Sequence, residues 1–258
     1  MRLVLIACCL LAVGGATATA FAGEAAARRV IGFSPDGARF AFEEFGAGDP
    51  GMGHVSVHSS ITIVDAASNE ISDDSVNASL DGGDETLLAP LRRLTAQAAA
   101  ETLKSDRIGA PGRLIGADAS SRPGEQFFYG EVWKVEAAAK ATLDVQAAEI
   151  GGKAKIVLDY DRPAPIAGQQ GEPSSATPPT FVVTLVKPDG RRIALTGAVA
   201  DPGAKERRDF YKYAIAEAYL MPRKGKTPVI AILVETFTQG GEGDNRNFIP
   251  VAVALPAP

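Results

Sequence analysis

The stretch from residue 31 to residue 70 constrains the fold most, because short apolar runs alternate in it with strong turn signals. Its first part is a hairpin pattern in which the turn SPDG (34–37) separates VIGF from ARFAFEEF. Proline presets φ at the first central turn position and glycine accepts a positive φ, so this turn needs little strain. Residues 54–65 then alternate as a half-buried strand does. The sequence therefore predicts a chain built on antiparallel hairpins.

One later segment has helical periodicity. It follows a polar stretch (72–84) that predicts no regular element, and its apolar residues recur at spacings of three and four. The expected buried face consists of Leu87, Leu91, Leu94, Ala98 and Thr102, with Leu88, Thr95 and Ala99 beside it. Proline is tolerated only in the first turn of a helix, so Pro90 predicts a start near Ala89 and an end before Gly109. This helix is expected to lie on a sheet.

The rest of the chain returns to strand patterns. A second hairpin with a Pro-Asp-Gly turn covers 181–196, and the continuously apolar run 229–234 is typical of a central strand. Residues 161–180 are rich in Pro, Gly and Ser and predict a loop or linker between a β-rich part at 23–160 with one helix and a β-rich part at 181–258. One continuous domain over 23–258 is the alternative.

The predicted fold class is α+β and β-rich, with antiparallel hairpins and one helix packed on a sheet. A β-propeller-like repeat is the alternative, because Pro35-Asp36-Gly37 and Pro188-Asp189-Gly190 begin similar hairpins. Propeller blades recur at intervals of about 40 to 45 residues. The two copies here lie 153 residues apart, which favours the α+β fold.

The N-terminus has the layout of a secretory signal peptide, with Arg2, an apolar run over 3–13 and then small residues. Cleavage after Ala22 is expected, so 1–22 is the predicted leader. A lipoprotein site at Cys8 is the alternative, but too few residues precede it for export. Removal of the leader takes both cysteines away, so the mature chain forms no disulfide. We expect a periplasmic or secreted protein without stable membrane insertion, since no second apolar run is long enough to span a bilayer.

Three segments carry a resemblance to a known family: FSPDGARFAFEEFG near the mature start, ITIVDAASN, and the closing ILVETFTQGGEGDNRNFIPVAVAL. With these segments the chain resembles a bacterial family of predicted secreted proteins, domain of unknown function 2259. The chain departs from the family pattern at 49–54, where it has DPGMGH in place of an acidic-Gly-Ser-Gly sequence and an aromatic residue. The resemblance implies export, and it implies no activity and no catalytic residue.

Composition and motifs exclude several classes of function. The formal net charge is −5 and no basic stripe is present, so nucleic acid is not an expected partner. The chain has no nucleophile elbow, no phosphate loop and no dinucleotide fingerprint, so no cofactor is predicted.

The carboxylates of the 43–49 region are the catalytic candidates, with Glu44 and Asp49 foremost. Paired carboxylates hydrolyse glycosidic bonds when they flank a cleft. Adjacent strand residues point to opposite faces, however, so Glu43 and Glu44 are not expected to serve one site. The competing interpretation is an exposed sheet edge that these charges keep soluble.

The remaining candidates are metal ligands and aromatic residues. His54 and His58 would lie about 13 Å apart on one strand face, too far to share a metal. Glu242 and Asp244 offer oxygen ligands in a Gly-rich turn, but without the ordered spacing of a calcium loop, so no metal is predicted. The aromatic residues Phe128, Tyr129 and Trp133 form either a stacking platform for a sugar or peptide, or ordinary core.

Two functions follow from these patterns. The first is a non-enzymatic binding or scaffolding module of the bacterial cell envelope, which recognises an envelope protein or polymer through a sheet face or a loop. The alternative is a hydrolase that acts on an envelope polymer with the carboxylates of the 43–49 region.

Overall fold

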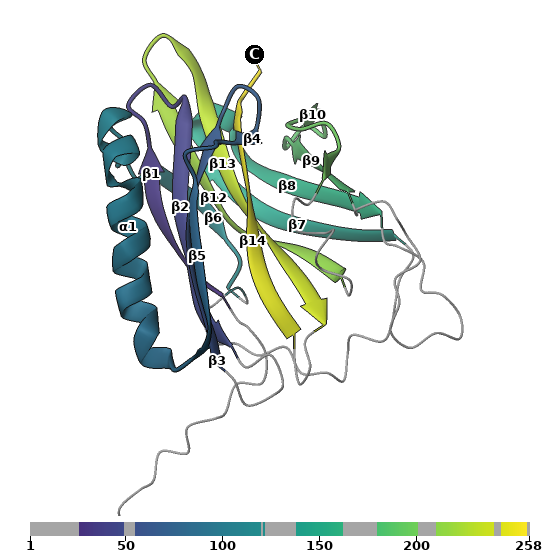
Figure 1. The fold of residues 1–258 in the computed structure, drawn as a ribbon. Helices are drawn as coiled ribbons and strands as arrows, with labels where there is room; N and C mark the ends of the chain where they lie inside the picture. The colour runs from purple at the N-terminus through teal and green to yellow at the C-terminus, as the bar shows by residue number, and fades with distance from the viewer. Residues whose placement is uncertain are drawn as a thin grey trace, which may run out of the picture.

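The computed structural model describes residues 26–48, 55–119, 121, 138–161, 180–200, 210–239 and 244–256. In these residues the strands form three antiparallel sheets, and one α-helix lies on the outside of the stack (Figure 1). The predicted α+β, β-rich class with one helix packed on a sheet is therefore confirmed. The described strands do not form the blades of a propeller, so the alternative repeat fold is wrong.

The N-terminal strands form what we call the helix-side sheet. Its members are β1 (Ala27–Phe33), β2 (Arg39–Gly48), β3 (Val55–Asp65), β4 (Glu70–Ile71) and β5 (Val76–Gly83). They follow the order β1-β2-β3, and both β4 and β5 pair with β3. The hairpin predicted around SPDG is present as β1 and β2. The strand β5 was not predicted, because it is an outer strand of mostly polar and small residues without an apolar alternation.

The central sheet is formed mainly by the C-terminal part of the chain. Its members are β6 (Arg113–Ala117), β12 (Phe210–Arg223), β13 (Lys226–Gln239) and β14 (Asp244–Ala254), in the order β14-β13-β12-β6. The apolar run 229–234 lies in β13, between β12 and β14, which confirms the predicted central strand.

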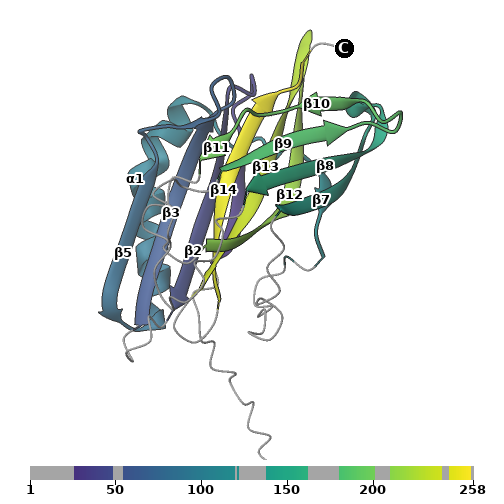
Figure 2. The same ribbon diagram turned by 90° about the vertical axis from the view of Figure 1, so that its right-hand side faces the viewer.

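The third sheet, called here the lateral sheet, lies on the other side of the central sheet from the helix (Figure 2). Its members are β7 (Ala138–Ala147), β8 (Gly152–Asp161), β9 (Thr180–Val186), β10 (Arg192–Ala194) and β11 (Val199–Ala200). A short 3₁₀ turn, η2 (Ala148–Ile150), joins β7 to β8. The strands β8 and β9 flank the Pro-rich segment and pair with each other, so that segment links neighbours within one sheet.

Both faces of the central sheet are buried, and β13 shows why its sequence is apolar without interruption. Its odd-numbered residues from 229 to 233 pack with Phe40 and Phe42 of the helix-side sheet. Its even-numbered residues from 230 to 234 pack with Leu158 and Leu185 of the lateral sheet. Burial of large apolar side chains on both faces contributes most of the favourable free energy of folding in such a stack.

The helix α1 (Leu88–Ser105) covers the outer face of the helix-side sheet and follows a 3₁₀ turn, η1 (Glu85–Leu87). Its bounds agree with the prediction, and Pro90 lies in the first turn. The predicted buried face is wrong in part: the buried residues are Leu91, Thr95 and Ala99, whereas Leu94 is 60% exposed. A polar contact explains why Thr95 faces the sheet: its hydroxyl and the buried Ser59 hydroxyl of β3 share a hydrogen bond of 2.8 Å. Among the described residues, no helix is both long enough and apolar enough to span a membrane.

Candidate functional site

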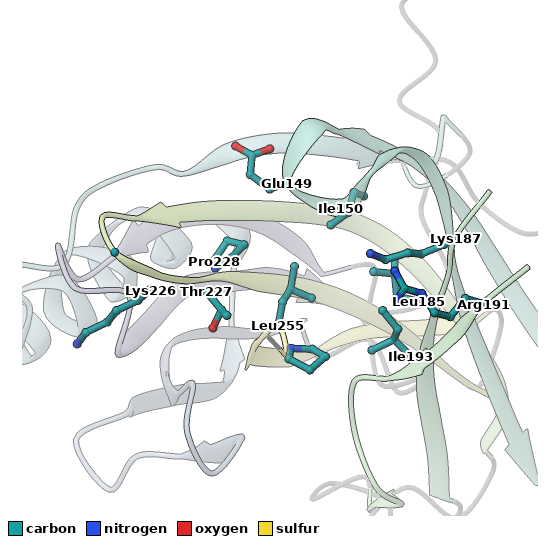
Figure 3. A pocket seen from close by; sticks show the side chains of 12 residues that line it. Glu149, Ile150, Leu185, Lys187, Arg191, Ile193, Lys226, Thr227, Pro228 and Leu255 are labelled. Atoms are coloured by element: carbon teal, nitrogen blue, oxygen red, sulfur yellow. The ribbon is translucent and has the colours of Figure 1, made fainter. Parts of the chain in front are cut away.

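A cavity of about 530 Å³ lies between the lateral and central sheets, beside the β9–β10 and β12–β13 turns (Figure 3). Four separate segments line it: the turn η2, the β9–β10 hairpin, the β12–β13 turn and the C-terminal residues that follow β14. The backbone N–H of Leu255 donates to the carbonyl of Pro228 at 2.9 Å and fixes the last two of these segments to each other. The volume lies in the range of about 300–1,000 Å³ that is typical of sites for small organic ligands.

The floor of the cavity is apolar. It is formed by Ile150, Leu185 and Leu255, which belong to the core between the lateral and central sheets. Ile193 and Pro228 are half-buried and line the walls. A ligand in this cavity would therefore contact a surface that extends directly from the hydrophobic core.

Cationic side chains surround the opening. Lys187 and Arg191 lie together beside the β9–β10 turn, and Lys226 lies on the opposite side of the cavity in the view of Figure 3. Among the described residues, none of the three forms an ion pair with a carboxylate. The described lining residues include one carboxylate, that of Glu149, and its charge is balanced by an ion pair with Arg113. The opening is therefore net positive on a chain of net charge −5.

A second group of polar residues lies between the helix-side and central sheets, and we call it the interlayer charge cluster: Arg28, Glu217, Glu235 and Arg246. Arg28 of β1 donates to Oε1 of Glu217 at 2.9 Å and lies 3.8 Å from Oε1 of Glu235. Arg246 of β14 lies 3.9 Å from the same oxygen of Glu235 and donates to the carbonyl of Ala26. These contacts hold the start of β1 against the central sheet.

Two groups in or beside the cluster have shifted pKa values. Burial raises the pKa of Glu235, although the Ser121 hydroxyl donates to it and two arginines lie close. Burial, followed by the neighbouring Glu217 carboxylate, raises the pKa of the Tyr219 phenol. Shifted pKa values occur in active sites and equally in structural ion-pair networks. None of the cluster residues lines the cavity described above, and their contacts explain a structural role.

The structure places Glu43 and Glu44 on opposite faces of β2, as the sequence predicts. Glu43 points to the helix, where Arg92 donates to both of its carboxylate oxygens, at 2.7 and 2.9 Å, and Arg29 lies 2.7 Å away. The interpretation of Glu43 as part of an exposed sheet edge is wrong: its residue is 1% exposed and β2 is an inner strand. Burial alone would raise the pKa of Glu43, but the two guanidinium groups offset it and hold the pKa below the ordinary value.

We expect Glu43→Gln to lower the free energy of unfolding at pH 7 by about 2 kcal/mol, because a buried carboxylate with two arginine partners loses its charge. The loss of stability is no larger because Arg29 is largely exposed, so water screens its attraction to Glu43. The folded-state pKa is lowered, so the stabilisation is complete above the ordinary value of 4.5 and is lost as the pH falls through the folded-state pKa. Urea unfolding at pH 7 and at successively lower pH measures the difference, which should shrink in acid.

Glu235→Gln is the matched control, since burial shifts the pKa of Glu235 upward. A raised folded-state pKa means stability that is present below the ordinary value and is lost as the pH rises through the folded-state pKa. Relative to the wild type, this variant should become more stable as the pH rises. The same pH response in both variants would contradict the assignment.

Glu44 points to the central sheet and binds its outer strand. Its Oε2 accepts the backbone N–H of Phe248 in β14 at 2.6 Å, and its Oε1 lies 3.9 Å from Nε2 of His58. Farther along β14, Asn69 Oδ1 accepts the N–H of Ala252. Side chains of the helix-side sheet thus satisfy two outward-facing donors of an edge strand, which otherwise offers a template for aggregation. This contact explains Glu44 as a structural residue.

The other predicted candidates fall mainly outside the described residues: Asp49, His54, Phe128, Tyr129, Trp133 and Glu242. For Asp244 the structure describes only the backbone, at the start of β14. His58 lies on β3 beside Glu44, and within the described part of the chain no group of three His, Cys, Asp or Glu side chains could hold a metal. The two described candidates, Glu44 and His58, therefore lie side by side, and neither lines the cavity.

The cavity was not predicted from the sequence, because its described lining comes from four segments that are distant in the chain. One signal was present: the Pro-Asp-Gly turn at 188–190 places a lysine and an arginine on its two flanks. No family model, curated protein or solved structure matches this chain.

Proposed function

We propose that this protein is an exported, non-enzymatic binding module of the bacterial cell envelope, and that the cavity between the lateral and central sheets is its binding site. The observation that carries the proposal is a cavity with an apolar floor and a cationic opening. Small-molecule sites have this composition, in which apolar walls supply affinity and a few polar groups fix orientation.

The contacts of the titratable residues favour binding over catalysis. Among its described residues the lining contains no Ser, Cys or His, and the one carboxylate among them is already paired with Arg113. In Glu44, the described candidate for hydrolysis, one carboxylate oxygen already accepts a hydrogen bond from the backbone of β14. General acid–base catalysis needs a group within hydrogen-bond reach of the substrate, which neither arrangement offers.

The experiment fills the cavity and measures binding. In Ile193→Trp a half-buried wall residue becomes larger and occupies the space, whereas Val182→Trp adds the same ring at a half-buried position on β9 that does not line the cavity. Each protein is recovered from the exporting cell, exposed to a small-molecule extract of the envelope, and studied by native mass spectrometry. Circular dichroism shows whether each variant is folded.

We expect a bound small molecule in the wild type and in Val182→Trp, and its loss in Ile193→Trp. A wild type that binds nothing, or a folded Ile193→Trp that binds as the wild type does, would overturn the proposal. Export is tested separately by N-terminal sequencing of the periplasmic and secreted fractions, which should begin at Gly23. Membership of the domain of unknown function 2259 family stays a prediction, and it assigns no ligand.

A further inference from the structure

We infer that the cavity takes an amphiphile with one anionic head and an apolar tail, and that Lys187 and Arg191 hold the head. This inference rests on the proposed function, since it names the class of ligand for the same site. Three features support it: the register of the β9–β10 hairpin, the charges around the opening and the apolar floor.

The hairpin register places the two cations opposite each other. Ile193 pairs with Leu185, Arg192 pairs with Val186, and the N–H of Lys187 donates to the carbonyl of Arg191 at 2.9 Å. Side chains alternate along a strand, so Lys187 and Arg191 share the face of Leu185 and Ile193, which is the face that lines the cavity. Directly opposite residues have β-carbons about 4.5–5.5 Å apart.

Two like charges at such positions destabilise a hairpin unless an opposite charge lies near. The next residue, Arg192, has an oppositely charged partner: on the outer face of the hairpin it forms an ion pair of 3.3 Å with Asp159. Asp189 of the same turn accepts the backbone N–H of Arg191 at 2.9 Å, but no described carboxylate forms an ion pair with the side chain of Lys187 or Arg191. An anion bound between them would remove the repulsion, and a guanidinium binds a carboxylate or phosphate group with two parallel hydrogen bonds.

The third cation at the opening is less suited to this role. The positive charge of Lys226 already contributes, after several hydrogen bonds, to lowering the pKa of Asp36. Lys226 also lies across the cavity from Lys187 and Arg191, which lie together (Figure 3). The head is therefore assigned to Lys187 and Arg191, and Lys226 adds only to the positive potential of the opening.

The floor determines the rest of the ligand. Ile150 and Leu185 are each 1% exposed and Leu255 is 7% exposed, so the half-buried Ile193 and Pro228 add apolar surface that a ligand can reach, and none of these five residues offers a polar side-chain partner to a second charged group. A hydrocarbon tail gains affinity with each methylene group that it buries on such a surface. A small anion without a tail would leave the floor unused, and a neutral amphiphile would leave the two cations without a partner.

The experiment uses a series that separates head from tail. Decanoate, decanol and decyltrimethylammonium share a tail and differ in head charge, while acetate keeps the head and removes the tail. Binding to the full-length exported protein is measured by isothermal titration calorimetry below the micelle concentration of each ligand. We expect decanoate to bind, its affinity to fall at higher ionic strength, and the other three ligands to bind at least tenfold more weakly.

Two sets of variants locate the head. The double variant Lys187→Gln/Arg191→Gln should weaken decanoate binding about tenfold or more, since two charged hydrogen-bond donors are lost. The matched control Arg192→Gln removes a neighbouring charge from the opposite face of the same hairpin and should change the affinity less than about twofold. The filled variant Ile193→Trp should abolish decanoate binding.

The outcomes separate this inference from the proposed function. Equal binding of decanol and decanoate, with Ile193→Trp still blocking both, would overturn the anionic head and leave the binding module standing. Absence of any ligand in wild type and variants alike would overturn both. Sedimentation with phosphatidylglycerol vesicles without binding of free decanoate would assign the cations to a membrane surface and overturn the soluble amphiphile.

Discussion

Gly32→Ala is expected to lower the free energy of unfolding by more than about 3 kcal/mol. Gly32 has a φ of +132°, a region that only glycine adopts readily, and it lies at a bulge in β1. A β-carbon at this position would lie 2.5 Å from the carbonyl oxygen of Ala110. That oxygen is fixed, because it accepts the N–H of Phe33 at 2.6 Å. Backbone strain and a backbone clash therefore add at one residue.

Gly190→Ala separates the two causes. Gly190 has a φ of +83°, and a β-carbon there would meet no atom within 4 Å. We expect this control to cost about 1–2 kcal/mol, the strain of a left-handed alanine alone. Urea unfolding followed by circular dichroism measures both variants. A loss at Gly32 no larger than that at Gly190 would show that the crossing of β1 by the segment after α1 is not tight.

Phe40→Ala is expected to cost about 3–5 kcal/mol, the usual loss for a large aromatic side chain in a packed core. Phe40 is fully buried between the helix-side and central sheets, and its ring centroid lies 4.9 Å from that of Phe33. Removal of the ring leaves a cavity between two sheets that are each held in place by their own hydrogen bonds, so the space cannot close easily.

Phe45→Ala is the control from the same strand. Phe45 lies on the opposite face of β2, is half-buried, and has the Arg92 guanidinium 3.4 Å above its ring. Its loss removes a cation–π contact and part of an apolar surface, for which we expect about 1 kcal/mol. Chemical unfolding should rank Phe40→Ala well below Phe45→Ala in stability. Equal losses would contradict the assignment of the main core to the side of β2 that faces the central sheet.

Local patterns predicted much of the fold because each was complete within a short stretch. The two Pro-Asp-Gly hairpins, the helix bounds and the central strand β13 are examples, and each depends on residues that lie close together in the sequence. The rotation of α1 was not predicted, since it depends on a hydrogen bond between Thr95 and Ser59, 36 positions apart. The polar strand β5 was missed because backbone pairing with β3, rather than an apolar face, makes it a strand.

The candidate site was less predictable than the fold. The acidic residues near a Gly-rich loop made Glu44 of the 43–49 region a catalytic candidate. Only the packing of β2 against β14 shows what its carboxylate binds. The cavity depends on how distant segments of the lateral and central sheets pack together, and no local sequence pattern encodes that packing. Its cationic pair could have been found from the second hairpin, because the register of a Pro-Asp-Gly turn places Lys187 opposite Arg191.

The central sheet has a consequence for how the chain matures. Three of its four strands, β12, β13 and β14, follow all strands of both outer sheets in the chain, so the outer sheets lack their apolar cover until these three strands have been synthesised. Contacts between distant parts of a sequence also form slowly. Loss of β14 alone would leave two incomplete cores open to proteolysis, because its residues belong to both of them.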